Sequence, residues 1–209
     1  MSNLTVIDTN LPDFLQTAGV SDLTKQLAGK TGVKRIVPKN GIFRKMVGGE
    51  EMGKVKGNLD VVIVNASPKV GRIFYAKAWT PDADPTAPDC FSNDGQAPDA
   101  SSANPQSDRC DSCEQNVKGS GQGESRACRF SQRLAVVLAN DIKGDVFQLT
   151  LPAASIFGEG APGKWPLQTY AKMIGSKGIP ISTVVTEMRF DTDSATPKLT
   201  FKPVKVLEK

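Results

Sequence analysis

The chain has 209 residues, of which 39% are hydrophobic and 23% charged, with a net charge of +4. This composition is typical of a soluble globular protein with one large domain or two small ones. No apolar run approaches the roughly 18 residues needed to cross a membrane, so we expect no membrane contact. The first residues lack the basic and apolar regions of a signal peptide, which predicts a cytoplasmic protein.

The charge is divided unevenly along the chain. Residues 80–128 contain three basic and nine acidic side chains, a net charge of −6, whereas the rest of the chain has a net charge of +10. A basic body favours a polyanionic partner, of which nucleic acid is the common one. The simpler alternative is that Lys and Arg only solvate the surface.

The elements predicted in chain order are mostly strands. Residues 1–32 form a predicted arm, with a short helix that begins near Ser21 and ends at Gly29. The glycine-rich residues 48–53 are predicted to be a loop, and 165–174 is the best internal helix candidate. Strands are predicted at 33–37, 41–47, 59–65, 71–80, 133–140, 146–151, 182–190 and 199–206.

Because few helices interrupt the strands, the pattern argues against alternating βαβ units. It predicts a mainly β fold, an OB-like barrel with extra strands and one or two helices. An SH3-like barrel or a sandwich is the alternative. The barrel domain would span 33–209, with 80–130 as a cysteine-rich insertion. Residues 81–125 are too polar to order themselves by burial, so the insertion needs another source of stability.

All four cysteines of the chain fall within this insertion: Cys90, Cys110, Cys113 and Cys128. The middle pair forms a C-x₂-C knuckle, which places two sulfurs on one tight turn. Two further thiolates would complete the tetrahedral shell that zinc prefers in structural sites. Four protein ligands leave no open position for water, so we expect a structural Zn²⁺ rather than a catalytic one. Its binding can contribute about 10 kcal/mol of folding energy.

Two disulfides are the alternative to zinc. Cys110 and Cys113 are too close for an easy mutual bridge, but each could pair with an outer cysteine. A cytosolic protein keeps its thiols reduced, and for that reason we favour the metal.

Enzyme machinery is not apparent in the sequence. The chain has no histidine, which excludes Ser-His and Cys-His nucleophile pairs, and it has no phosphate-binding or nucleophile-elbow motif. We therefore predict a non-enzymatic protein. The alternative is a magnesium-dependent nuclease site built from the acidic cluster of the insertion, formed by Asp82, Asp84, Asp89, Asp94 and Asp99.

Features that suit nucleic-acid binding are more numerous. In the strand predicted at 71–80, Tyr75, Lys77 and Trp79 share one face, which could stack bases beside phosphates. The alternative is that Tyr75 and Trp79 are buried in the core with only one edge of each ring in contact with solvent. The other candidates lie in the first two strands and beside the strand that leaves the cysteine window: Lys34, Arg35, Lys39, Phe43, Arg44, Lys45, Arg129 and Arg133. Lys54 and Lys56 add positive charge in the predicted loop.

The order of these segments resembles a known family. Residues 88–95, the knuckle at 110–113, the glycines at 119–123, Cys128 and residues 133–136 together resemble the zinc-containing single-stranded-DNA-binding proteins of tailed bacteriophages. The resemblance covers roughly residues 55–150 and is strongest across 88–136. It implies an OB fold, a structural zinc, cooperative coating of single strands, and a role in phage DNA replication and recombination. Phe91 lies within the signature and joins the candidate DNA contacts.

The chain departs from that family in two respects. The best-known members use a histidine as one zinc ligand, whereas all four positions here are cysteine. Many members also end in an acidic tail that recruits replication proteins, and this chain ends in a lysine-rich segment. We therefore carry two hypotheses. One is a single-stranded-DNA-binding protein, and the other is a zinc-stabilised adaptor that docks a protein partner through the acidic insertion.

Overall fold

The computed structural model describes residues 32–77, 86–194 and 196–207. The predicted arm helix, Trp79, Asp82 and Asp84 lie outside the described residues. The elements in chain order are β1 (Lys34–Lys39), β2 (Ile42–Val47), β3 (Glu50–Lys56), β4 (Asn58–Ala66), β5 (Gly71–Phe74), β6 (Cys90–Ser92), the 3-10 helix η1 (Glu114–Asn116), β7 (Arg129–Leu138), β8 (Val146–Pro152), α3 (Ala153–Ile156), α4 (Leu167–Gly175), the 3-10 helix η2 (Ile181–Thr183), β9 (Val184–Phe190) and β10 (Leu199–Val206).

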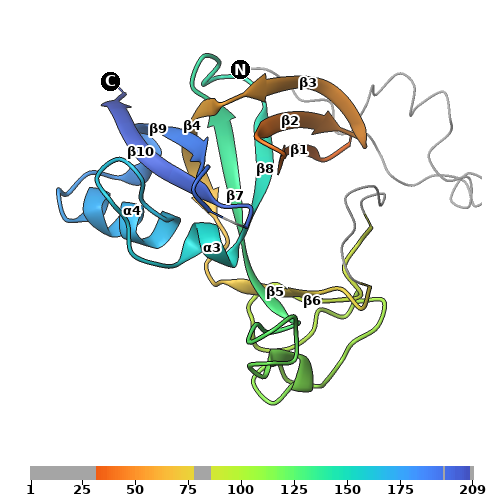
Figure 1. Cartoon of the computed structure of the whole chain (residues 1–209). Helices are drawn as coiled ribbons and strands as arrows, with labels where there is room; N and C mark the ends of the chain where they lie inside the picture. The colour runs from red at the N-terminus through yellow and green to blue at the C-terminus, as the bar shows by residue number, and fades with distance from the viewer. Residues whose placement is uncertain (1–31, 78–85, 195, 208–209) are drawn as a thin grey trace, which may run out of the picture.

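The strands form one curled sheet in the order β10-β9-β4-β7-β8-β1-β2-β3, with β5 pairing both β6 and β7 (Figure 1). Strands β1 and β8 run parallel, and the other strand pairs of the described chain are antiparallel. The sheet curls into a half-barrel, which confirms the predicted mainly β, OB-like fold with extra strands.

Two tight turns build the β1–β2–β3 meander. Asn40 and Gly41 join β1 to β2 with φ angles of 52° and 74°, and Gly48 and Gly49 join β2 to β3 with φ angles of 57° and 91°. Positive φ at both central residues is the geometry of two-residue turns that match the twist of the flanking strands. The prediction of a loop over 48–53 was therefore wrong. The glycines form a hairpin turn, and β3 follows it.

Other strands differ from prediction in length. Strand β5 ends at Phe74, well before residue 80, and β7 begins at Arg129 rather than at residue 133. The short strand β6 was not predicted. The early start of β7 lets residues 129–131 pair with β5. This pairing attaches the insertion directly to the sheet.

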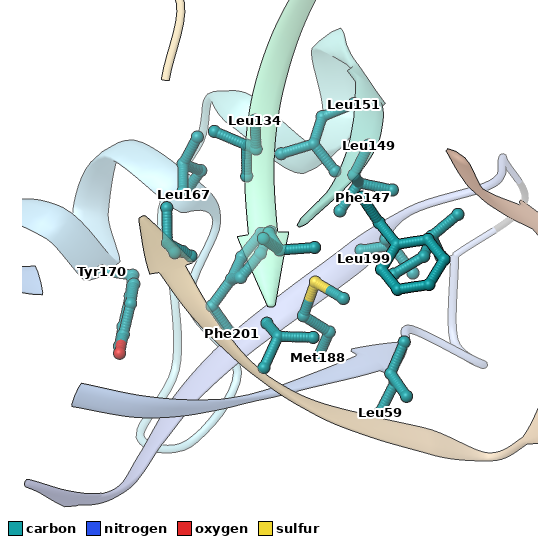
Figure 2. Packing of buried hydrophobic residues seen from close by; sticks show 14 of the residues in the cluster. Leu59, Leu134, Phe147, Leu149, Leu151, Leu167, Tyr170, Met188, Leu199 and Phe201 are labelled. Atoms are coloured by element: carbon teal, nitrogen blue, oxygen red, sulfur yellow. The ribbon is translucent and has the colours of Figure 1, made fainter. Parts of the chain in front are cut away.

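The main core lies between the curled sheet and helices α3 and α4 (Figures 1 and 2). Helix α4 buries Leu167, Tyr170 and Ile174 on one face, as its helical spacing predicts. The Tyr170 ring stacks on Phe201 of β10, with centroids 6.0 Å apart. Its hydroxyl lies 2.7 Å from Thr186 Oγ1, so the buried polar group has a hydrogen-bond partner. Within the described part of the chain, no helix has the length and apolar character needed to span a membrane.

The insertion lies at the far end of β7, away from this core (Figure 1). Between β6 and β7, over residues 93–127, the only buried residues are Ser102, Cys110 and Cys113. A small apolar cluster of Phe74, Cys90 and Cys128 joins the insertion to β5. Burial of large apolar side chains therefore does not order this segment.

Candidate metal centre and nucleic-acid face

The four cysteines come from three structural elements that meet at the base of the insertion. Cys90 opens β6 and pairs in register with Phe74 of β5. Cys110 and Cys113 form the knuckle, and η1 follows Cys113 directly. Cys128 immediately precedes β7. All four side chains are buried, and all four are free thiols rather than members of two disulfides.

These cysteines line a single cavity with a volume of about 10 Å³, close to the space of one water-sized sphere. Burial, together with the charges of the other three cysteines and against the opposing charge of Arg72, raises the pKa of Cys128 to about 11. Burial likewise raises the pKa of Cys110, which interacts with Cys90 and Cys113. Since all four line one small cavity, the structure brings the four predicted ligands to one place at the base of the insertion.

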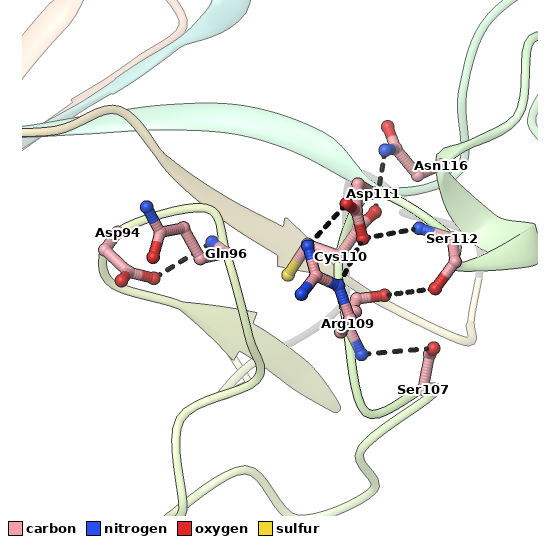
Figure 3. Close-up of polar contacts among 8 residues, drawn as sticks. All are labelled: Asp94, Gln96, Ser107, Arg109, Cys110, Asp111, Ser112 and Asn116. Carbon is pink, nitrogen blue, oxygen red and sulfur yellow. Dashed lines mark hydrogen bonds and ion pairs between the residues drawn. The ribbon is translucent and has the colours of Figure 1, made fainter.

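Backbone hydrogen bonds hold the knuckle in place. The Cys110 N–H donates to the carbonyl of Gln96 at 2.8 Å, and the Cys128 N–H donates to the carbonyl of Gln115 at 2.7 Å. The Asn116 side chain donates to the carbonyl of Cys110 at 2.7 Å (Figure 3). The geometry of the knuckle is thus set by polar contacts within the insertion.

Side chains beside the knuckle add further polar contacts. Arg109 binds Asp111 through two hydrogen bonds, of 3.1 and 2.8 Å, and Asp111 also accepts from the Ser112 N–H (Figure 3). The Arg109–Asp111 pair is largely exposed to solvent. It therefore supports the local turn and contributes little to global stability.

The donor set suits zinc, since four sulfurs without water are the ligands of a closed structural site. Thiols with raised pKa values must lose their protons to become ligands, so binding would release protons. Among the described residues, however, no group of three or more Cys, Asp or Glu side chains meets the geometry of a formed metal site. The cluster is compatible with zinc, and zinc itself stays a prediction.

A second candidate site is the outer face of the β1–β2–β3 meander. Ile36 and Phe43 point into the core, so their strand neighbours point outward. One cross-strand row of outward side chains runs from Val37 of β1 through Arg44 of β2 to Lys54 of β3. The next outward row, two residues along each strand, runs from Lys39 through Ile42 to Lys56. The outward face carries five cations and one acid, which are Arg35, Lys39, Arg44, Lys54, Lys56 and Glu51.

This arrangement places like charges side by side. Arg44 and Lys54 lie directly opposite each other, and like charges at such positions destabilise a sheet. Glu51 forms an ion pair with Arg44 and offsets part of the repulsion. Half-buried apolar side chains, Ile42 and Met46, separate the cations. A bound polyanion would relieve the remaining repulsion, and this makes the face a candidate phosphate-binding surface.

The face continues onto a shallow groove between β1, β8, β7 and the end of β4. Arg35 pairs with Gln148 of β8, which pairs with Ala135 of β7. The groove has a volume of about 370 Å³ and includes Gln148, Ala135 and the exposed Arg133 in its lining. Its polar lining also includes Lys34, Asn65 and Ser67. Lys34 and Arg133 were predicted from the sequence, whereas the uncharged groove residues carry no recognisable motif and were not predicted.

Not all predicted contacts belong to this surface. The side chain of Phe43 is fully buried and packs on Phe190 with ring centroids 4.8 Å apart, so it is not a base contact. That prediction was wrong because the ring lies on the core face of β2. Lys45 lies on the same side as Phe43, and its stem covers Gly53. Lys34 forms an ion pair with Asp145.

The predicted aromatic platform is only partly present in the described residues. Tyr75 is 44% exposed and Lys77 is exposed, but both follow the end of β5 rather than sharing a strand face. Burial and the nearby charge of Asp89 raise the pKa of Tyr75. Phe91, in the middle of β6, is half-buried. The described stacking candidates therefore lie beside the insertion, not on the cationic face.

The two remaining predicted cations lie on β7. Arg129 is exposed at the start of β7 and is paired with Ile73. Arg133 contacts the side chain of Asn93, a residue of the insertion. Arg133 thus stands between the cationic surface and the insertion.

Each described carboxylate of the acidic cluster accepts hydrogen bonds from nearby donors. Asp89 accepts a hydrogen bond from the Ala76 N–H, whereas hydrogen bonds from Gln96 and Ser101 lower the pKa values of Asp94 and Asp99 respectively. Asp94 and Asp99 stabilise local turns, whereas Asp89 connects the chain before β6 to the chain that follows β5. Asp82 and Asp84 lie outside the described residues, and the nuclease alternative stays a hypothesis.

The class defined by fold and site is a mainly β half-barrel with a four-cysteine insertion and a cationic outer sheet face. Comparisons with family models, curated proteins and solved structures find no match to this chain. The resemblance to phage single-stranded-DNA-binding proteins consequently rests on the sequence signature alone.

Proposed function

We propose that this chain is a non-catalytic protein that binds and protects single-stranded DNA, in the replication and recombination of a tailed bacteriophage and hence in the host cytoplasm. The observation that carries the proposal is the cationic outer face of β1–β3. Five basic side chains lie together on the side of these strands that faces away from the core. Zn²⁺ held by the four cysteines would supply the folding energy of the insertion.

Phosphate contact dominates binding in this proposal. Among the described residues of the cationic face none is aromatic, so the DNA strand would be held there through its phosphate backbone, with a steep dependence on salt. Tyr75 and Phe91 would stack bases where the strand passes the insertion, each contributing about 1–3 kcal/mol. Arg133 connects the two parts.

A salt titration of binding to oligo-dT, with duplex DNA as control, tests the proposal. For single strands the slope of log K against log salt is about −0.7 per phosphate contact. Replacing the exposed Arg35, Lys54 and Lys56 by Gln should therefore make the slope shallower by about 2 units. A matched variant with Lys143, Lys172 and Lys177 changed to Gln has the same net charge and should keep the wild-type slope, because these side chains lie off the face.

Two outcomes would contradict the proposal. Preference for duplex over oligo-dT at low salt would exclude a single-strand role. Equal slopes for the two triple variants would show that net charge alone governs binding. A protein partner captured through the acidic insertion, with no nucleic acid bound, would instead favour the adaptor hypothesis.

A further inference from the structure

Arg72 of β5 connects the sheet to the cysteine cluster. Its guanidinium carbon lies 4.1 Å from the centroid of the Phe130 ring on β7, a cation–π contact. Its Nη1 donates to Asn116 Oδ1 at 2.5 Å, and Asn116 donates in turn to the carbonyl of Cys110. The side chain is thus fixed on one side by the barrel and on the other by the knuckle.

One atom of this side chain lacks a partner. Arg72 Nε is buried, and it is the only buried side-chain nitrogen or oxygen in the described residues without a hydrogen bond. Leaving a buried donor unsatisfied costs about 1–3 kcal/mol, and more when the group is charged. An orphaned donor in an otherwise well-bonded side chain indicates that an acceptor belongs beside it.

The cysteines beside the Arg72 side chain are a source of such an acceptor. Arg72 pairs in register with Phe130, which follows Cys128 by two residues, and its hydrogen-bond partner Asn116 contacts the carbonyl of Cys110. Four thiolates around one Zn²⁺ carry a net charge of about −2. Outer-shell donors commonly orient and tune metal ligands, and their loss costs about 10- to 100-fold in metal affinity.

We propose that Arg72 donates its Nε–H to the sulfur of Cys110 or Cys128 in the metal-loaded protein and offsets half of the cluster's net charge. The inference rests on the zinc site of the proposed function. The same guanidinium packs on Phe130 of β7, so this hydrogen bond connects the metal ligands to the sheet. Arg72 is a positioning residue, since it acts on the ligands and not on the metal.

The test compares Arg72→Met with Arg109→Met in the full-length chain. Arg109 lines the same cavity, but its side chain is 72% exposed and pairs with Asp111. Zinc affinity is measured by competition with a chromophoric chelator. Arg72→Met should weaken binding by about 10- to 100-fold, whereas Arg109→Met should change it by no more than about threefold. Equal affinities for wild type and Arg72→Met would overturn the inference.

The reactivity of the metal-bound thiolates gives a readout that a purely structural role would not move. A thiolate that accepts a hydrogen bond is a weaker nucleophile, so iodoacetamide should alkylate zinc-loaded Arg72→Met faster than the zinc-loaded wild type. Arg72→Lys, which keeps the charge but loses the Nε donor, should also react faster. If both variants react at the wild-type rate, the proposed hydrogen bond does not exist.

A measurement on the wild type covers the case in which Arg72 variants fail to fold. In protein loaded with ¹¹³Cd²⁺ and labelled with ¹⁵N-arginine, an N–H···S bond gives a scalar correlation between the Arg72 Hε proton and the metal. Absence of that correlation would overturn the inference while leaving the zinc site intact. Failure of the wild type to bind zinc at all would overturn both, and salt-sensitive DNA binding would decide the rest of the proposed function separately.

Discussion

The barrel body and the cysteine-rich insertion reach an ordered structure by different means. The body buries a cluster of 18 residues, almost all of them large and apolar, between its sheet and two helices. The insertion buries three side chains over residues 93–127, and two of them are cysteines. The body is therefore held by the hydrophobic effect, whereas the insertion depends on polar turns and on its sulfur cluster.

The two regions also differ in charge and in what they offer a partner. The outward face of the β1–β2–β3 meander is cationic and lies on strands that the core fixes firmly. The insertion is acidic and joins the body through β5, β6 and the first residues of β7. This contrast implies that the stability of one region can be changed while the other stays folded.

Cys113→Ser should produce the largest separation between the two regions. Loss of one thiolate would remove the proposed four-ligand zinc site, and with it up to about 10 kcal/mol of metal-linked folding energy. We expect zinc to be lost and amides of the insertion to exchange rapidly, while amides of the buried β7 residues stay protected. Elemental analysis and hydrogen exchange measure the two effects.

The control for this experiment is Ser112→Ala, an exposed neighbour between the knuckle cysteines that should keep one zinc per chain. Stoichiometric zinc in Cys113→Ser would refute the four-thiolate assignment. Loss of protection in β7 would show that the two regions unfold as one unit.

Phe201→Ala should produce the opposite pattern. The ring is fully buried and stacks on Tyr170, so its removal leaves a cavity and costs about 3–5 kcal/mol of unfolding free energy. We expect a lower denaturant midpoint with unchanged zinc content in the folded fraction. Val204→Ala, at a 51% exposed position of the same strand, is the control and should change the midpoint little. Loss of zinc from folded Phe201→Ala would mean that the core and the insertion are not independent.

The sequence predicted the body better than the site. Alternation of apolar and polar residues located most strands, because the core requires one apolar face on each. Strand β3 was missed because Gly48, Gly49 and Gly53 suggested a loop. In the structure the first two form a hairpin turn, and Gly53 lies within the strand, where a Cβ would approach Lys45 Cε to 3.1 Å.

The site was predictable only where spacing carries the information. The C-x₂-C knuckle and its two outer cysteines could be grouped from sequence, since ligand spacing follows from the geometry of a metal shell. The contacts of Arg72 with Phe130 and Asn116 could not be predicted, because they depend on the register between β5 and β7. The burial of Phe43 likewise depends on which face of β2 meets the core.

We expect the smallest effect from removing single ion pairs, one in the body and one in the insertion. In the body, Lys198 and Asp191 lie 2.8 Å apart with side chains only 25% and 11% exposed, whereas the Asp111 side chain in the insertion is 65% exposed. Asp191→Asn should therefore lower the unfolding free energy of the body by about 1 kcal/mol at pH 7, and Asp111→Asn should leave it unchanged.

The pH dependence of that difference follows from the pKa of Asp191. The hydrogen bond from Lys198 holds this pKa below its ordinary value of 3.8, so the folded state favours the ionised carboxylate. The stabilisation is complete well above 3.8 and is lost as the pH falls through the lowered pKa. Denaturant titrations from neutral to acid pH should accordingly show the Asp191→Asn and wild-type curves converging below 3.8. Equal losses for the Asp191 and Asp111 variants at pH 7 would mean that burial does not distinguish the two pairs.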